Sequence, residues 1–198
     1  MPKPYTPNDK WSQRAASEGF RARSVYKLQE LNEKFHLLEP GMTVLDLGAA
    51  PGSWLQEVSL QIGPEGKAIG LDLTDIEPIA DNVETLVQDV TDVPAVEKIL
   101  SDRGISHVDL VLSDMAPSTS GVKDVDQWRS VELCQAVLAI ADAVLKPEGT
   151  AVMKIFRGAD FDEFVNVVRA QYANVRVAQV KASRDRSREV YIVARKKI

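Results

Sequence analysis

Apolar residues recur along this chain in two alternating patterns. Val25, Leu28, Leu31 and Phe35 are spaced by three and four residues, as on one face of an amphipathic helix. Similar segments between turn residues predict helices at 24–35, 54–62, 94–102, 125–145 and 161–172. Short apolar runs that end at acidic, Gly or Pro residues predict strands at 43–46, 67–71, 83–87, 108–112, 150–156, 175–180 and 190–194.

The order of these elements predicts the fold class. Strands that alternate with helices indicate a mostly parallel sheet with helices on both faces. Only about ten residues join the last two strands, which is short for a parallel crossover, so we expect the last strand to be antiparallel. The expected fold is a doubly wound, seven-stranded Rossmann-like α/β sheet. We expect one domain, 1–198, in which about residues 1–20 form a loosely ordered basic segment.

Two local signals refine the boundaries of these elements. Ser53 stands directly before the second predicted helix, where a serine side chain commonly caps the first turn. Residues 147–149 (PEG) combine two turn-forming residues, and they are expected to separate the fourth helix from the next strand.

Composition narrows the class of protein. The chain of 198 residues is 44% hydrophobic and 27% charged, as is usual for a globular protein. No apolar run reaches the length that spans a bilayer, and the N-terminus has no signal-peptide pattern. The single cysteine, Cys134, excludes an internal disulfide and is expected in the core. These features predict a cytoplasmic protein without a membrane partner, and the two histidines are too isolated to indicate a metal site.

Charge is distributed unevenly. The net charge is −5, yet residues 1–27 carry six basic and two acidic side chains, and residues 181–198 carry seven basic and two acidic ones. Two basic ends on an acidic body suit phosphate binding if the fold brings them together. Charge alone leaves open the alternative that these basic residues only keep the chain soluble. For an RNA partner, we expect phosphate contacts by Arg14, Arg21, Arg23, Arg184, Arg186 and Arg188.

A loop after the first predicted strand is the expected cofactor site, because ligands of such sheets bind at the carboxyl ends of the strands. Residues 46–52 read DLGAAPG, and the small residues Gly48 and Gly52 allow a ligand close to the backbone. Asp72 ends the second strand, where a carboxylate commonly binds ribose hydroxyls, and Asp89 ends the third, where it could accept from an adenine amino group. The spacing differs from G-x-G-x-x-G, and Pro51 removes an amide donor, so S-adenosylmethionine fits better than a nicotinamide dinucleotide.

Five segments resemble one known family. They are residues 21–28 (RARSVYKL), 46–54 (DLGAAPGSW), 113–117 (SDMAP), 152–156 (VMKIF) and 187–191 (SREVY). In this order they closely resemble the FtsJ/RrmJ family of RNA 2′-O-ribose methyltransferases, over about residues 20–195. The resemblance implies a catalytic tetrad of Lys27, Asp114, Lys154 and Glu189. It also implies S-adenosylmethionine as the cofactor, bound by Gly52, Trp54, Asp72, Asp89 and Asp114.

The tetrad makes chemical sense for methylation of a hydroxyl. The 2′-hydroxyl has a pKa far above neutral, so a base must take its proton or a cation must stabilise the alkoxide. We assign Lys154 as the principal catalyst, as a neutral base or as a cationic stabiliser. Asp114 would orient Lys154 and contact the cofactor, while Lys27 and Glu189 would complete the network. Taken singly, each of these residues has an ordinary reading as a solvated or capping side chain.

Resemblance to the compact single-domain members of the family implies large-subunit ribosomal RNA as the substrate, at a uridine of the peptidyl-transferase region, and we expect a monomer. Two alternatives remain open at this stage. One is an enzyme with the same catalytic set that methylates a transfer-RNA anticodon loop. The other is a non-catalytic RNA-binding factor for ribosome assembly.

Overall fold

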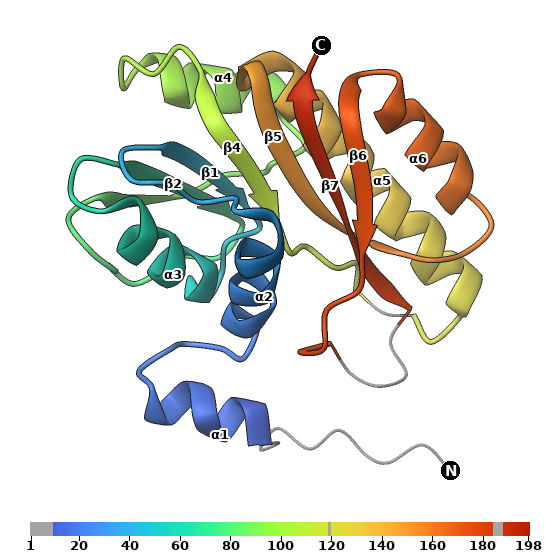
Figure 1. Cartoon of the computed structure of the whole chain (residues 1–198), viewed down its shortest axis with the longest axis horizontal. Helices are drawn as coiled ribbons and strands as arrows, with labels where there is room; N and C mark the ends of the chain where they lie inside the picture. The colour runs from blue at the N-terminus through green and yellow to red at the C-terminus, as the bar shows by residue number, and fades with distance from the viewer. Residues whose placement is uncertain (1–9, 119, 184–187) are drawn as a thin grey trace.

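A seven-stranded sheet forms the centre of the computed structural model, which describes residues 10–118, 120–183 and 188–198 (Figure 1). The strands lie in the order β3-β2-β1-β4-β5-β7-β6. Their bounds are β1 (Thr43–Leu47), β2 (Lys67–Asp72), β3 (Val83–Val87), β4 (Val108–Ser113), β5 (Leu145–Phe156), β6 (Tyr172–Ala178) and β7 (Glu189–Lys197). Each of the seven predicted strands is present, and boundaries differ by a few residues.

The strand directions confirm the doubly wound fold class. β1 is parallel to β2 and β4, β2 to β3, and β4 to β5. β7 is antiparallel to both β5 and β6, so the last strand is reversed as predicted. It lies between β5 and β6 and not at the edge of the sheet. This insertion brings the start of β7 beside the end of β5, with Glu189 opposite Phe156.

Helices cover both faces of the sheet (Figure 1). Their bounds are α1 (Lys10–Ser17), α2 (Val25–Phe35), α3 (Ser53–Ile62), α4 (Val93–Ser101), α5 (Lys123–Val144) and α6 (Phe161–Arg169). One apolar cluster joins α2 and α3 to the sheet, and a second joins α4, α5 and α6 to it. Neighbours on β5 alternate between the two clusters, with Val152 in the first and Met153 in the second, as the two-residue period of a strand requires.

The N-terminal segment differs from its expectation. From residue 10 onward it is ordered as α1, in place of a loosely ordered segment over about 1–20. Ala15 is buried in a small third cluster with Val25, Tyr26 and Ala182. The Trp11 ring lies 5.2 Å from the Tyr26 ring, centroid to centroid. These apolar contacts fix a helix whose own sequence is mostly polar. Residues 1–9 lie outside the described part.

Two boundary predictions are wrong. The N-cap of α3 is Gly52, and Ser53 is already helical, so its hydroxyl bonds to Ser24 Oγ at 2.7 Å and caps nothing. Residues 147–149 do not interrupt β5, which runs on from Leu145. Instead, these residues lie in an irregularity of the pairing with β4, where Val108 pairs with Leu145 and Leu110 pairs with Thr150. None of the helices in the described ranges has the length and apolar character needed to cross a bilayer.

Candidate active site

Four predicted catalytic residues meet at one edge of the sheet because of its topology. Asp114 follows the end of β4, and Lys154 lies near the end of the neighbouring parallel strand β5. Glu189 begins β7, which runs the opposite way and therefore starts at that edge. Lys27 comes from α2, the helix that covers this face of the sheet. The structure thus brings together residues that lie up to 162 positions apart in the sequence.

Asp114 is the centre of this network. Its Oδ1 lies 2.9 Å from Lys154 Nζ and 3.6 Å from Lys27 Nζ. Lys154 Nζ also donates to the Asp114 backbone carbonyl. Lys27 Nζ lies 2.7 Å from Glu189 Oε1, which makes a chain of alternating charges. Only 7% of the Lys154 side chain is exposed, so its charge is poorly screened by water.

Tyr191 is a further member of the network that the sequence analysis did not assign. Its hydroxyl lies 2.5 Å from Asp114 Oδ1 and 3.5 Å from Glu189 Oε1. A phenol has one proton, so the shorter contact receives it and Asp114 is the acceptor. Burial, and then the nearby carboxylates of Asp114 and Glu189, raise the pKa of Tyr191 well above its usual range. The two-residue period of a strand could have identified Tyr191 from the sequence, because residues 189 and 191 share one face of β7.

Ser183 and Lys27 hold Glu189 from two sides. The Ser183 hydroxyl donates to Glu189 Oε1 at 2.6 Å, the same oxygen that contacts Lys27. The carboxylate of Glu189 is therefore fixed by the segment between β6 and β7 as well as by α2. Glu189 therefore holds Lys27, and it is connected to Lys154 through Lys27 and Asp114.

A cavity of about 500 Å³ opens beside Asp114. Four residues predicted to bind the cofactor contribute to its lining, namely Gly48, Asp72, Asp89 and Asp114. Leu73, Val90, Met115 and Leu133 add apolar surface. Among the residues that line it, in the part of the chain that the structure describes, none is a Lys or Arg. Carboxylates and apolar side chains suit a ligand with hydroxyl groups, a flat base and a positive charge, and they disfavour a pyrophosphate.

Asp72 and Asp89 are held in place by nearby backbone amides. Asp72 Oδ2 accepts from Ala50 N at 3.0 Å and its Oδ1 from Thr74 N at 2.8 Å. Asp89 Oδ1 accepts from both the amide and the hydroxyl of Thr91 at 2.8 Å. These hydrogen bonds lower the pKa of Asp89 below its ordinary value and keep it ionised. Each carboxylate keeps further lone pairs for a ligand.

Gly48, Gly52 and Trp54 have different surroundings. At Gly48 a side chain would collide with Met115, because an added Cβ would lie 2.0 Å from Met115 Cγ. Gly52 has a φ of 99° and faces Ile79 and Arg21, outside the cavity lining. Trp54 is buried, and its Nε1 donates to the Ser24 carbonyl at 2.8 Å, also outside that lining. Cofactor contacts by Gly52 and Trp54 stay predictions.

Asp46 is a second residue that the sequence analysis left unassigned. It is 1% exposed on β1, and its Oδ2 has no hydrogen-bond partner. Burial, and then the nearby carboxylates of Asp114 and Asp72, raise the pKa of Asp46 well above its usual range. The sequence feature that could have identified Asp46 is an acidic residue within an otherwise apolar strand. Asp46 therefore keeps its proton to higher pH than an ordinary carboxyl group does, beneath the site.

The arginines predicted to contact RNA have varied surroundings. Arg14 on α1 is 55% exposed at its side chain and pairs with Glu18 at 2.7 Å. Arg23 Nη2 donates to the Ala182 carbonyl, and the exposed Arg188 donates to the Lys123 carbonyl. The Arg21 guanidinium donates to three backbone carbonyls beside the cofactor loop. The remaining two, Arg184 and Arg186, lie outside the described residues.

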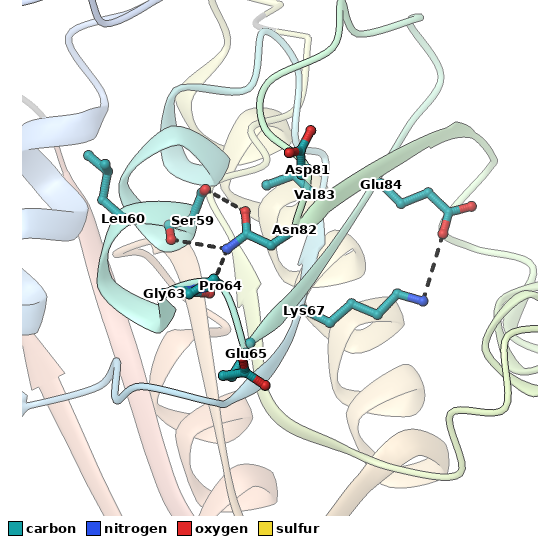
Figure 2. Close-up of a pocket in the computed structure, with 11 residues that line it drawn as sticks. Ser59, Leu60, Gly63, Pro64, Glu65, Lys67, Asp81, Asn82, Val83 and Glu84 are labelled. Atoms are coloured by element: carbon teal, nitrogen blue, oxygen red, sulfur yellow. Dashed lines mark hydrogen bonds and ion pairs between the residues drawn. The ribbon is translucent and has the colours of Figure 1, made fainter.

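A larger hollow of about 810 Å³ lies at the opposite end of the sheet, around the starts of β2 and β3 (Figure 2). Its polar side chains bind one another. Asn82 bonds to Ser59 and to the Gly63 carbonyl, and Lys67 reaches towards Glu84 at 3.9 Å. This hollow is remote from the tetrad because it lies at the amino ends of the parallel strands.

Cys134 lies in the core, and the described residues form no metal-binding cluster. Cys134 is buried on α5 and donates to the Lys154 carbonyl at 3.0 Å, and burial raises the pKa of its thiol to about 12. It is therefore a core residue, as predicted. Over the described ranges, no three His, Cys, Asp or Glu side chains form a group that could hold a metal ion.

Comparison with known proteins gives consistent matches. The model of a family described as FtsJ-like methyltransferase matches residues 20–197. Ribosomal RNA large subunit methyltransferase E of Azoarcus sp. (strain BH72) is 45% identical over 186 residues, 94% of this chain and 90% of that protein. The protein of the same name from Pseudomonas fluorescens is 44% identical over 188 residues, 95% of this chain and 90% of that protein.

Solved structures are similar too. A crystal structure of a candidate ribosomal RNA methyltransferase from Plasmodium falciparum has a TM-score of 0.80 and 26% identity, covering 90% of this chain and 98% of that one. A candidate rRNA methylase from Clostridium thermocellum has a TM-score of 0.59 over 86% of this chain and 97% of that one. At 17% identity, it supports the fold alone.

Proposed function

Because this chain belongs to the FtsJ-like methyltransferase family, we propose that it methylates the 2′-hydroxyl of a ribose in large-subunit ribosomal RNA, with S-adenosylmethionine as the methyl donor. The relatives named ribosomal RNA large subunit methyltransferase E, which match nearly the whole chain, support this substrate. One observation supports it from the site itself. Asp114 lines the acidic cavity and also holds Lys154, so the proposed cofactor cavity and the proposed catalyst share a residue.

The residues of the cavity fit S-adenosylmethionine. In our proposal Asp72 accepts from the ribose hydroxyls and Asp89 from the adenine amino group, while Leu73, Val90 and Leu133 enclose the base. The acidic lining suits a cofactor with a positive charge. When bound, S-adenosylmethionine would supply a methyl group on a sulfonium. The leaving group is the neutral thioether of S-adenosylhomocysteine, which needs no acid.

The remaining task is to activate the attacking hydroxyl, and we assign it to Lys154. An ammonium has three N–H donors, and two of those on Lys154 are directed to the side chain and carbonyl of Asp114. The third is available for the 2′-oxygen. As an ammonium, Lys154 stabilises the developing alkoxide in a poorly solvated site; as a neutral amine, it takes the proton.

The other members of the network hold Lys154 and the ribose. Asp114 fixes the Lys154 amine, and the Tyr191 hydroxyl fixes Asp114 in turn. Lys27, held by Glu189, adds a second positive charge at the same edge. The two apolar clusters pack on opposite faces of one sheet, which supports our proposal of a single catalytic domain.

Methyl transfer to defined acceptors tests the proposal. The protein would be incubated with labelled S-adenosylmethionine and large ribosomal subunits, free ribosomal RNA or transfer RNA, and the 2′-O-methylated nucleotide would then be mapped. We expect label at one ribose of the large-subunit RNA, and none with Lys154→Ala. Label on transfer RNA alone would identify an anticodon-loop enzyme. Bound cofactor without label on any acceptor would favour an assembly factor.

A further inference from the structure

Arg21 is bound to the backbone of two separate loops. It lies in the connection between α1 and α2, and its guanidinium reaches beyond the N-terminus of α3. Its Nη1 donates to the Pro51 carbonyl at 3.0 Å and to the Glu77 carbonyl at 2.8 Å. Its Nη2 donates to the Pro78 carbonyl at 2.8 Å. The rigid fork of a guanidinium can satisfy three carbonyls in one plane, whereas an ammonium cannot match that geometry.

The two loops that Arg21 joins each continue from residues that line the cofactor cavity. Pro51 follows Ala50, which lines the cavity and donates its amide to Asp72. Glu77 and Pro78 belong to the connection that leaves the cavity lining at Asp72 and Leu73. Arg21 therefore links the loop before α3, which donates to Asp72, to the loop that follows Asp72 in the chain.

The backbone around Arg21 is fastened to the same region. Arg21 N donates to Gln56 Oε1 at 2.9 Å, and Gln56 Nε2 donates to the Gly19 carbonyl at 3.0 Å. Trp54 Nε1 donates to the Ser24 carbonyl at 2.8 Å. The guanidinium is packed as well as bonded, because a Cβ added at Gly52 would lie 3.1 Å from Arg21 Nη1.

From these contacts we propose that Arg21 is a positioning residue for the cofactor, one that fixes the two loops around Asp72, and that it is not a phosphate contact. The inference rests on the proposed function in one respect, since it takes the ligand of this cavity to be S-adenosylmethionine. An unfixed pair of loops must be ordered again on each binding event, which weakens binding. Loss of the guanidinium hydrogen bonds to these carbonyls should weaken cofactor binding by about tenfold.

Arg21→Lys separates this role from phosphate binding. Lysine keeps the positive charge that a phosphate contact needs, but it loses the fork that joins three carbonyls. Arg21→Met removes both. A positioning role predicts that both variants bind the cofactor more weakly than the wild type does. A phosphate contact predicts that neither variant changes cofactor affinity. Arg169→Lys on α6 is the matched control, because Arg169 is exposed and remote from the cavity.

The experiment is calorimetric titration of S-adenosylhomocysteine into the full chain without RNA, at a temperature well below unfolding. We expect about tenfold weaker binding for Arg21→Lys and Arg21→Met, and no change for Arg169→Lys. In steady-state methylation of the same RNA, KM for the cofactor should rise by a similar factor while kcat at saturation changes by less than about twofold. A purely structural role would lower the unfolding temperature and leave this KM unchanged.

Two results would overturn the inference. One is wild-type affinity for S-adenosylhomocysteine in Arg21→Lys. The other is a fall of about 0.7 to 0.9 in the salt slope of RNA binding in Arg21→Met, which would indicate a lost phosphate contact. Failure of the wild-type protein to bind S-adenosylhomocysteine would instead overturn the proposed function, so the two failures are distinguishable.

Discussion

Replacement of Lys154 by Met should abolish most of the methyl transfer while leaving the cofactor bound. Met keeps the length of the side chain and removes its charge. In a site with an effective dielectric constant of about 20, a unit charge about 3 Å from a full alkoxide is worth about 5 kcal/mol. The 2′-oxygen carries only a partial negative charge in the transition state, so only part of this energy is lost on replacement. We expect kcat to fall by about 10²- to 10⁴-fold.

The same replacement should cost little in folding. Asp114 keeps the Tyr191 hydroxyl at 2.5 Å and Lys27 at 3.6 Å, so its carboxylate stays partnered. We expect a loss of about 1–2 kcal/mol in the free energy of unfolding, less than for a fully isolated buried charge. Cofactor affinity should be unchanged, because Lys154 does not contribute to the cavity lining.

Single-turnover transfer from labelled S-adenosylmethionine to large ribosomal subunits would measure the rate, with calorimetry for the cofactor and denaturant unfolding for stability. Lys154→Arg then distinguishes the two chemical roles, because a guanidinium keeps its charge and cannot act as a base near neutral pH. Activity above that of Lys154→Met indicates a cationic stabiliser, and equal inactivity a base. A loss in kcat below tenfold in Lys154→Met, or an equal loss of cofactor affinity, would refute the assignment.

Three further outcomes are expected. Asp72→Ala should weaken cofactor binding by at least about tenfold, since it removes a ligand carboxylate and the acceptor of the Ala50 amide; unchanged affinity in calorimetry would remove Asp72 from the site. Tyr191→Phe should lower kcat by about tenfold, because Asp114 loses a hydrogen bond to its ionised form, and a wild-type rate would show that the hydroxyl is dispensable. Asp46→Asn should flatten the dependence of stability on pH. The raised pKa of Asp46 means that its contribution is full below its ordinary value of 3.8 and is lost as pH rises through the folded value. Urea unfolding across pH 5 to 9 would measure this, and parallel curves for the two proteins would contradict it.

Much of the fold could be predicted because local patterns determine it. The central strands β1 and β4 are buried on both faces and read as short apolar runs. The more exposed edge strands β3 and β6 were predicted as well, from apolar residues between turn signals. The positions of Asp72 and Asp89 also followed from local rules, since Asp72 ends β2 and Asp89 follows the end of β3 by two residues, both at the carboxyl edge of the sheet. The place of β7 between β5 and β6 did not follow, because a short connection indicates direction and not order in the sheet.

The network around Asp114 shows the limit of sequence reasoning without a family resemblance. Lys27 and Glu189 are ordinary surface residue types, and only the packing of α2 against the start of β7 brings them to 2.7 Å. Arg21 shows a second limit of sequence reasoning. Its charge suggested a phosphate contact, whereas the position of the Pro51 and Glu77 carbonyls, which no local pattern records, gives it other partners.

The place of β7 has a consequence for the order of folding. β6 precedes β7 in the chain but lies outside it, so β5 has no neighbour on that side until β7 pairs with both. Until then β5 is an open edge with apolar side chains, a state prone to pair with other chains. Glu189 and Tyr191 arrive on the same strand that closes this edge. Closure of the sheet and assembly of the proposed catalytic network thus depend on the same strand, and a chain in which β7 has not yet paired lacks Glu189 and Tyr191 at the site even if its cofactor loop has formed.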